Sequence, residues 1–211
     1  MHVTIIAKAP IPRRVKTRLC PPCTHLQAAE IAAAGLADTF EAVEATTAGT
    51  TLRRVLLLDG ERPAFTPAAF DVVAQRGDGL QQRLRNGFSD LGPGLIVGME
   101  TPQAAARLGE AVRWLRRGVD VIGLATDGGY WALGLSSVDA GSLRGIFDGV
   151  PMSRSHTGLT QLRRLHRLGR PVRLLSMARD LDSIEDLYAV AGRNQRGRLG
   201  AVASAVVASL G

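Results

Sequence analysis

The stretch VTIIAKAPIPRRVKTRL, residues 3–19, combines two different kinds of sequence. Its first five residues, VTIIA, are apolar or β-branched, which is typical of a buried β-strand. The twelve that follow contain five cations and two prolines, and the chain has no acidic residue before Glu30. Because proline disfavours both helix and sheet interiors, we expect a basic loop directly after a first strand.

The rest of the chain alternates between strand-like and helix-like segments. Predicted strands cover residues 55–58, 70–74, 94–99, 119–125, 130–135 and 172–175. Predicted helices cover residues 24–46, from 80, 102–117, 157–168, from 183, and 197–210, the first opened by a capping box of Thr24 and Gln27. This alternation predicts one α/β domain over residues 1–211, with three layers and a mostly parallel sheet.

The composition limits the class of protein. The hydrophobic fraction is 45%, and no apolar run reaches the roughly 18 residues that cross a bilayer, so we expect a cytoplasmic chain without a membrane span. The net charge is +7, and residues 144–211 hold eleven arginines against five acidic residues. An anionic partner is therefore expected, but 4% aromatics and the lack of a nucleic-acid-binding motif argue against nucleic acid.

Lysine is unusually distributed. Of 26 basic residues only Lys8 and Lys16 are lysines, and both lie in the basic loop. An ammonium group is a compact charge with three donors, unlike the planar guanidinium, so the clustering favours a site that needs ammonium groups. We expect a lysine side chain in such a loop to make few packing contacts. The alternative is an ordinary solvated surface segment.

Several carboxylates follow other predicted strands. Glu100 follows the strand ending at residue 99, Asp127 lies in the TDGG turn, and Asp180 and Asp182 follow the last strand. In an open parallel sheet, ligands bind beyond the carboxyl ends of the strands. Cations and carboxylates gathered there fit a nucleotide polyphosphate bridged by Mg²⁺ or Mn²⁺. Two simpler interpretations stay open: Asp127 forms only a hairpin turn, and Asp182 only caps the next helix.

Three other kinds of site are not favoured. The chain has neither G-x-x-x-x-G-K-[ST] nor G-x-G-x-x-G after the first strand, which argues against P-loop nucleoside triphosphatases and nicotinamide dehydrogenases. The motif CPPC, residues 20–23, lies near His25, but the remaining histidines supply no matching pair of zinc ligands. We expect two free thiols.

Five segments resemble, in order, a bacterial family of uncharacterised glycosyltransferases. They are AKAPIPRRVKTRLCPP, RGDGLQQRL, LIVGMETPQ, DGGYWALGL and RDLDSIEDL. The resemblance covers residues 3 to about 187. It implies the Rossmann-like A-type glycosyltransferase fold, which nucleotide-diphospho-sugar transferases share with phospholactate nucleotidylyltransferases.

The resemblance also implies roles for individual residues. A nucleotide would be held by the loop cations and by the Gly-Asp turn, an acceptor by the Asp-Gly-Gly-aromatic turn, and a metal by three carboxylates, with Asp127 and Lys16 as catalytic residues. The implied positions are Lys8, Arg14, Lys16, Arg18 and Asp78 for the nucleotide, Gly128, Gly129 and Tyr130 for the acceptor, and Glu100, Asp180 and Asp182 for Mg²⁺ or Mn²⁺.

The chain departs from the family pattern at three positions. Arg13 replaces the usual glycine, Glu100 an aspartate and Ser183 a threonine. The leading hypothesis is a metal-dependent transferase with a nucleotide-activated donor and a small-molecule acceptor, most simply a glycosyltransferase. One alternative is a nucleotidylyltransferase like the phospholactate guanylyltransferases; another is a nucleotide-binding protein with impaired catalysis. The sequence leaves the oligomeric state open.

Overall fold

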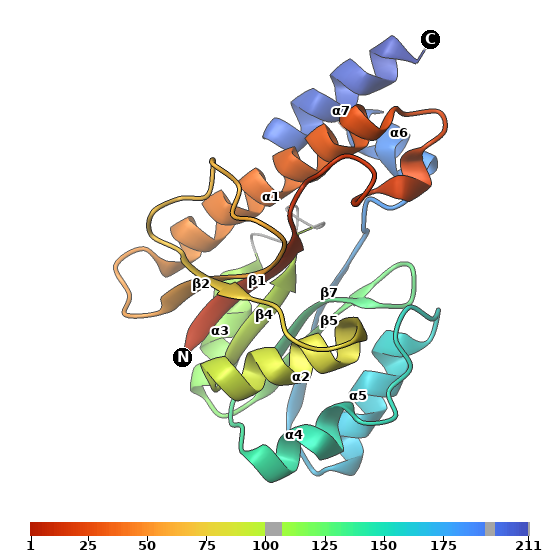
Figure 1. Cartoon of the computed structure of the whole chain (residues 1–211). Coiled ribbons are helices and arrows are strands. Elements are labelled where there is room, and N and C mark those ends of the chain that lie inside the picture. Colours follow the sequence, from red (N-terminus) through yellow and green to blue (C-terminus); the bar gives the residue numbers. More distant parts are fainter. Residues whose placement is uncertain (100–106, 193–196, 211) are drawn as a thin grey trace.

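A seven-stranded sheet forms the centre of the computed structural model, which describes residues 1–99, 107–192 and 197–210 (Figure 1). The strand order is β3-β2-β1-β4-β6-β5-β7. The strands are β1 His2–Lys8, β2 Arg53–Asp59, β3 Asp71–Ala74, β4 Gly94–Gly98, β5 Asp120–Ala125, β6 Tyr130–Leu135 and β7 Val172–Ala178. The predicted α/β class with a mostly parallel sheet is confirmed.

One strand runs against the others. β6 is antiparallel to both of its neighbours, β4 and β5, whereas every other adjacent pair is parallel. The short turn between β5 and β6 forces this reversal, because a parallel connection needs a crossover of a dozen or more residues. As a result, Tyr130 at the start of β6 lies at the same edge of the sheet as the carboxyl ends of the parallel strands.

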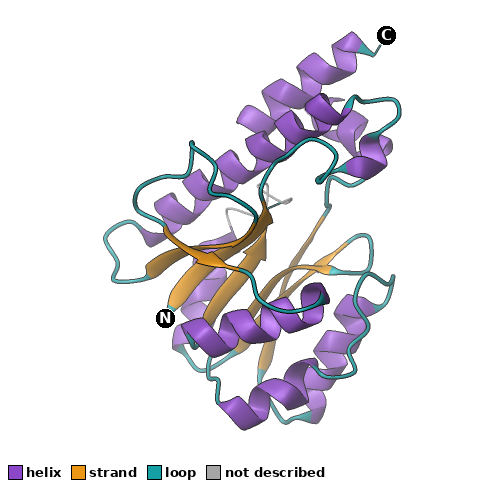
Figure 2. Ribbon diagram, viewed as in Figure 1, coloured by secondary structure: helices purple, strands orange, loops and turns teal. Residues whose placement is uncertain are grey.

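Helices cover both faces of the sheet, as Figure 2 shows. On one face α1 (His25–Thr47) and α3 (Leu108–Arg116) bury their apolar residues against the strands. On the other face α2 (Gly79–Leu91), α4 (Ala140–Phe147) and α5 (Thr157–Arg167) form a second core. The predicted three layers are therefore present. No helix in the described ranges is long and apolar enough to cross a bilayer.

The last two helices extend the first layer. α6 (Ile184–Gly192) and α7 (Arg198–Ser209) pack on the N-terminal part of α1 in a third apolar cluster, which also holds Leu19 and Cys23. This cluster anchors the segment that follows the basic loop.

The predicted helix boundaries hold in part. α1 begins with the predicted capping box, in which Thr24 and Gln27 each satisfy the other's backbone. α4 was missed, because its eight residues include two glycines, yet Asp139 and Ser142 form a second capping box at its start. The helix predicted over 102–117 is seen as α3 from Leu108, and residues 102–106 lie outside the described ranges.

His2 is a buried titratable group at the start of β1. Its side chain is 1% exposed, Nε2 lies 3.1 Å from the Gly92 carbonyl oxygen, and Nδ1 lies 2.7 Å from the Thr4 hydroxyl. Since a carbonyl only accepts, Nε2 carries the proton and the Thr4 hydroxyl donates to Nδ1. Burial lowers the pKa of His2 to about 4, against the opposing effect of the Gly92 hydrogen bond. The folded protein therefore holds a neutral imidazole.

We expect this imidazole to make folding stability depend on pH. The unfolded chain takes up a proton near pH 6.5 but the folded chain only near pH 4, so stability is lost as the pH falls through this window. The loss reaches about 2 kcal/mol at pH 5. Urea unfolding at pH 7.5 and pH 5 measures it. His2→Gln should remove this part of the pH dependence, whereas His25→Gln, at an exposed position, should not. Equal pH dependence in the wild type and His2→Gln would contradict the assignment.

Candidate functional site

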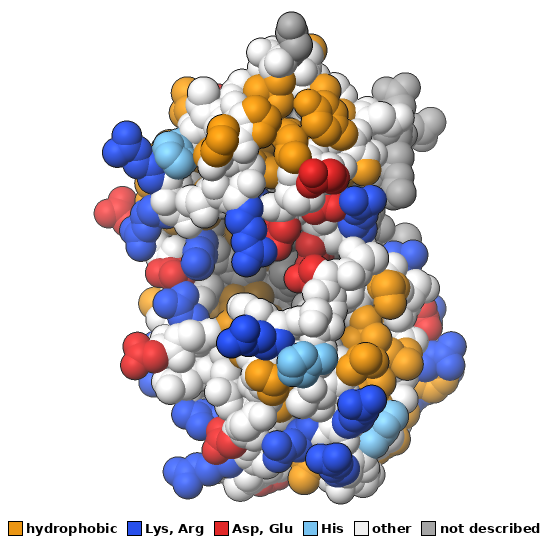
Figure 3. Space-filling view, turned by 90° about the vertical axis from the view of Figure 1, so that its right-hand side faces the viewer, with side chains coloured by type: hydrophobic (Ala, Val, Ile, Leu, Met, Phe, Trp, Pro, Cys, Tyr) orange, Lys and Arg blue, Asp and Glu red, His pale blue; other side chains and the backbone are white. Residues whose placement is uncertain are grey.

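A cleft of about 760 Å³ opens at the carboxyl ends of β1, β4 and β5. Figure 3 shows it as a hollow in the surface, with Lys and Arg side chains near one lip and acidic side chains near another. Many of the predicted site residues line this cleft although they are far apart in the sequence. They are Lys8, Arg14, Lys16, Arg18, Asp127, Gly129, Tyr130, Asp180 and Asp182.

Three predicted residues are not part of this lining as described. Asp78 precedes α2 without lining the cleft, although its neighbours Gly79 and Leu80 do line it. Gly128 packs behind the cleft wall. Glu100, the predicted metal ligand after β4, lies outside the described residues.

The basic loop holds two residues in the left-handed backbone conformation. Arg13 has φ 68° and Lys16 has φ 48°. Glycine adopts this conformation without strain, so position 13 has a backbone conformation that suits glycine although arginine occupies it. Arg13 does not line the cleft. The substitution therefore adds backbone strain without removing the turn.

Lys16 is the most buried cation of the loop. Its Nζ donates to Asp182 Oδ1 at 3.0 Å and to the Leu181 carbonyl, and its side chain is only 5% exposed. Arg18 Nη1 lies 3.7 Å from Asp182 Oδ2. The expectation that the Lys16 side chain makes few packing contacts is wrong. The side chain is buried, and its ammonium joins the loop after β1 to the segment after β7. These two walls of the cleft are held together by charge.

Asp182 does not cap α6, which was the simpler interpretation of this residue. Ser183 and Asp186 perform that role: Ser183 Oγ accepts from the Asp186 backbone at 3.2 Å, and Asp186 Oδ2 accepts from the Ser183 backbone at 2.9 Å. Asp186 Oδ2 also accepts from the backbone of Asp182 at 3.1 Å. The Asp182 side chain lines the cleft instead, where Oδ1 accepts from Lys16.

A hydrogen-bonded group that sequence reasoning missed lies beside the loop cations. Arg83 Nη1 donates to Asp59 Oδ2 at 2.7 Å and to Gln75 Oε1 at 3.2 Å. The Arg83 hydrogen bond outweighs burial and, with the nearby charges of Lys8 and Arg14, holds the pKa of Asp59 below its usual range. Arg83 and Gln75 line the cleft. The signal for Arg83 was its place in RGDGLQQRL, next to the predicted Gly-Asp turn.

The same part of the cleft has an apolar wall. Ile6, Leu80, Leu84 and Ile96 line it, and Arg83 adds a polar group. The Gln75 amide is committed to the protein, since its Nε2 donates to the Ala7 and Leu57 carbonyls at 2.7 and 3.0 Å. A flat, partly apolar group such as a nucleobase fits this wall.

The Asp-Gly-Gly turn is packed against the segment before α5. Asp127 Oδ1 accepts from the Gly129 backbone at 2.8 Å, and the Gly128 carbonyl accepts from Gly158 at 2.8 Å. Gly128 has φ +89°, and a β-carbon built on it would lie 1.9 Å from the Ser155 carbonyl oxygen. Glycine is required here for both reasons, and the contact places Asp127 at the cleft.

The segment before α5 forms a wall that the sequence did not reveal. Met152, Ser153, Arg154 and Ser155 of this segment line the cleft, together with Thr157 at the start of α5. Thr157 fixes it, because its hydroxyl donates to the Pro151 carbonyl at 2.7 Å and accepts from the Arg154 backbone at 3.0 Å. The signal was the polar run Ser-Arg-Ser-His directly before a predicted helix.

Tyr130 faces this wall. Its hydroxyl lies 3.9 Å from the Met152 sulfur, and burial raises the pKa of Tyr130 above its usual range. The phenol therefore stays protonated at neutral pH. It can donate a hydrogen bond to a ligand but is a poor base.

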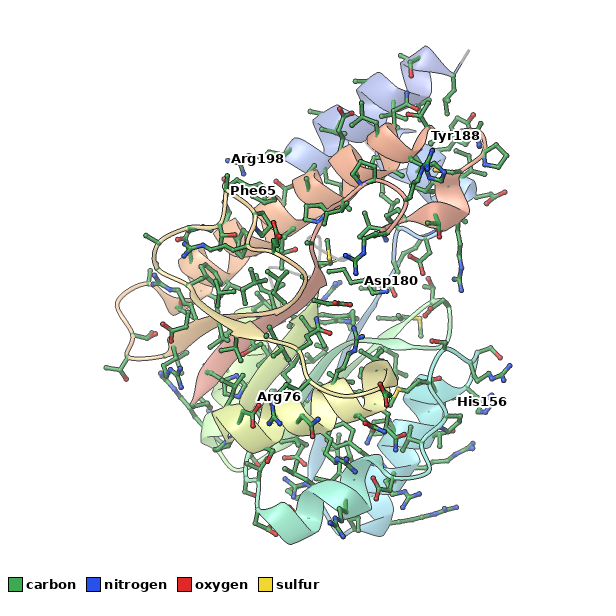
Figure 4. The ribbon with its side chains drawn as sticks, viewed as in Figure 1. Phe65, Arg76, His156, Asp180, Tyr188 and Arg198 are labelled. Atoms are coloured by element: carbon green, nitrogen blue, oxygen red, sulfur yellow. The ribbon has the colours of Figure 1, made fainter. Side chains whose placement is uncertain are left out.

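Asp180 and Asp182 are the two predicted metal ligands that lie within the described residues, and both line the cleft. Figure 4 labels Asp180, on the segment that joins β7 to the C-terminal helices. Among residues 1–99, 107–192 and 197–210, no group of three or more His, Cys, Asp or Glu side chains is spaced to hold a metal. Mg²⁺ commonly uses one or two carboxylates together with substrate phosphates, so this donor set fits such an ion.

The cysteines of CPPC take no part in the cleft lining. Cys20 and Cys23 are free thiols, as expected, and Cys23 is buried in the cluster between α1, α6 and α7.

Comparisons with known proteins agree with this fold. The profile of the family described as "Uncharacterized protein conserved in bacteria (DUF2064)" matches residues 28–154. A candidate nucleotide-diphospho-sugar transferase from Desulfovibrio desulfuricans G20 is similar over 100% of this chain and 97% of its own, with a TM-score of 0.79 and 21% identity. A cytidylyltransferase from Leptospira borgpetersenii serovar Hardjo-bovis covers 99% of this chain and 94% of its own, with a TM-score of 0.54 and 12% identity. A comparison with curated proteins found no match.

Proposed function

Because the chain belongs to the bacterial DUF2064 family and has a nucleotide-diphospho-sugar transferase-like fold, we propose that it is a transferase with a nucleotide-activated donor. The transferred group passes to a small-molecule acceptor, and glycosyl transfer is the leading case. The observation that supports this best is the cleft itself, where loop cations face carboxylates at the carboxyl edge of the sheet.

In this proposal the donor nucleotide lies between β1 and α2. Lys8, Arg14 and Arg18 hold its phosphates, because each lines the cleft and carries a positive charge that can pair with a phosphate oxygen. The base rests on the apolar wall beside Arg83. When the phosphates are bound, they compete with Asp182 for the ammonium of Lys16, which then helps to hold them.

The acceptor lies on the opposite side, between the Asp-Gly-Gly turn and the segment before α5. Asp127 is the proposed general base: Oδ1 is held by the Gly129 backbone, and Oδ2 takes the proton of an acceptor hydroxyl. Tyr130 donates a hydrogen bond to the acceptor. Met152 and Arg154 set the size and charge of this half of the cleft.

Mg²⁺ or Mn²⁺ would be held by Asp180 and Asp182, with Glu100 as a further proposed ligand. When bound, such an ion neutralises charge on the departing phosphate. The protein's own part is to position these carboxylates. Asp186 does so for Asp182 through its backbone hydrogen bond.

Nucleotidyl transfer is the second candidate. It is favoured by the likeness of fold to the Leptospira cytidylyltransferase and by the two lysines of the loop, which suit a triphosphate. The third candidate, a binding protein with impaired catalysis, is favoured by the departures at Arg13 and Glu100. Both candidates keep a nucleotide in the same cleft.

One experiment separates the three candidates. A thermal-shift screen of nucleoside diphosphates, triphosphates and nucleotide sugars, with Mn²⁺ or chelator, should identify ligands that raise the melting temperature. The ligand with the largest shift is then incubated with a panel of acceptors. Release of a nucleoside diphosphate marks glycosyl transfer, and release of pyrophosphate marks nucleotidyl transfer. Binding without release marks the binding protein, and no shift with any nucleotide overturns the proposal.

A further inference from the structure

Residues 149–179 carry charge of a single sign. This segment contains seven arginines and two histidines but no aspartate or glutamate. It includes the cleft wall before α5, all of α5, and β7, which is an edge strand of the sheet. The proposed transfer reaction uses only its first residues, at the cleft.

Part of this charge is neutralised within the protein. Arg170, Arg173 and Arg179 form ion pairs with Asp120, Glu110 and Asp186. Arg163 and Arg167 are exposed, and neither forms an ion pair with any residue in the described ranges. On a helix, positions four apart share a face, so these two charges project together from α5.

Large apolar side chains lie among these charges. Leu159 is 46% exposed and Leu168 is 45% exposed, at the two ends of α5. Leu174 and Met177 on β7 are 47% and 58% exposed. α5 contacts β7, and its buried face is made by Gln161 and Leu165, so Leu159 lies on the outward side with the arginines. Figure 3 shows hydrophobic side chains beside Lys, Arg and His on the face below the cleft.

We propose that this α5–β7 face, built on Leu159, Arg163, Arg167 and Leu174, docks on the surface of an anionic lipid bilayer. Arginine is attracted by the headgroup charge, and half-exposed leucine and methionine enter the boundary between headgroups and acyl chains. The face adjoins the cleft wall at residues 152–155, so docking brings the cleft to the membrane surface. The proposal does not depend on which reaction the cleft performs.

Nucleic acid fits this face less well. Residues 149–179 contain no Phe, Trp or Tyr, and so offer no aromatic ring on which a base can stack. Exposed leucines such as Leu159 and Leu174 would gain no apolar partner from a phosphate backbone. In a bilayer these apolar side chains gain an apolar partner, the acyl chains of the lipids.

Vesicle co-sedimentation of the full chain tests the proposal. The probes are vesicles of phosphatidylcholine alone and of phosphatidylcholine mixed with phosphatidylglycerol, whose anionic headgroups attract basic segments. We expect binding to the anionic vesicles only, weakened by added salt. Arg163→Gln with Arg167→Gln should reduce partitioning by about five-fold for each arginine removed. Leu159→Gln should reduce it as well.

A matched control removes two arginines from another helix. Arg113→Gln with Arg116→Gln changes the net charge equally on α3, which covers the opposite face of the sheet. Melting temperature and nucleotide binding, measured on each variant, show that the fold and the cleft are unaffected. Equal losses in the two double variants, or no binding to anionic vesicles at low salt, overturn the proposal. So does binding that a DNA duplex abolishes and Leu159→Gln leaves unchanged, which would indicate nucleic acid.

Discussion

Replacing Gly128 with alanine is expected to lower the free energy of unfolding by about 2–5 kcal/mol. Its φ of +89° costs a residue with a β-carbon about 1–2 kcal/mol. The new methyl group would also lie 1.9 Å from the Ser155 carbonyl oxygen. Because this neighbour is backbone, the turn and the segment before α5 must separate, which costs about 1–3 kcal/mol more.

Gly118→Ala is the matched control for this substitution. Gly118 has φ +77°, but a β-carbon there would meet nothing within 4 Å, so the control carries only the backbone cost. Urea unfolding should show the larger loss for Gly128→Ala. Group transfer should fall in that variant too, because Asp127 and Tyr130 flank the displaced residue. Equal losses at the two positions would show that the close contact with Ser155 is absent in solution.

Lys16→Met is expected to weaken nucleotide binding by about ten- to a hundred-fold, since a charge-assisted hydrogen bond contributes about 1.5–3 kcal/mol. Methionine keeps the length of the stem and removes the ammonium. Stability should fall as well, because Asp182 and the Leu181 carbonyl each lose a hydrogen bond from the ammonium. Calorimetry with the best nucleotide from the screen, well below the melting temperature, measures the affinity of the folded protein.

Arg13→Gln serves as the control for Lys16→Met. It removes one positive charge from the same loop, at a residue that does not line the cleft. Its nucleotide affinity should stay close to that of the wild type. If Lys16→Met lowers stability but leaves the dissociation constant unchanged, then Lys16 is structural and does not hold phosphate.

Local sequence was sufficient to predict most of the architecture. The apolar β-branched run before the basic loop predicted β1, and the Thr24–Gln27 pair predicted the start of α1, because both signals act over a few residues. The rule that ligands bind at the carboxyl ends of strands then grouped residues 8–18, 127–130 and 180–182. The structure places lining residues from all three groups around one cleft.

Contacts between distant segments were beyond this reasoning. The Lys16–Asp182 pair joins residues that are 166 positions apart. The residue type of neither one predicts which residue it contacts in the fold. The wall before α5 depends on the fit of Ser155 over Gly128, which is a matter of shape and not of residue type. Arg83 was missed as a cleft residue because its position follows from packing of α2 on the sheet. Tertiary geometry decides such features.

The Lys16–Asp182 pair also has a consequence for biosynthesis. The ribosome synthesises Lys16 166 residues before Asp182, at about 5–20 residues per second. Until α6 and α7 emerge, the apolar side of α1 around Ile31 and Ala34 has no cover. Chains whose synthesis stops before Asp182 therefore expose that surface of α1. In such chains the ammonium of Lys16 has no Asp182 carboxylate with which to pair. The cleft is therefore completed only after the segment with Asp180 and Asp182 has been synthesised.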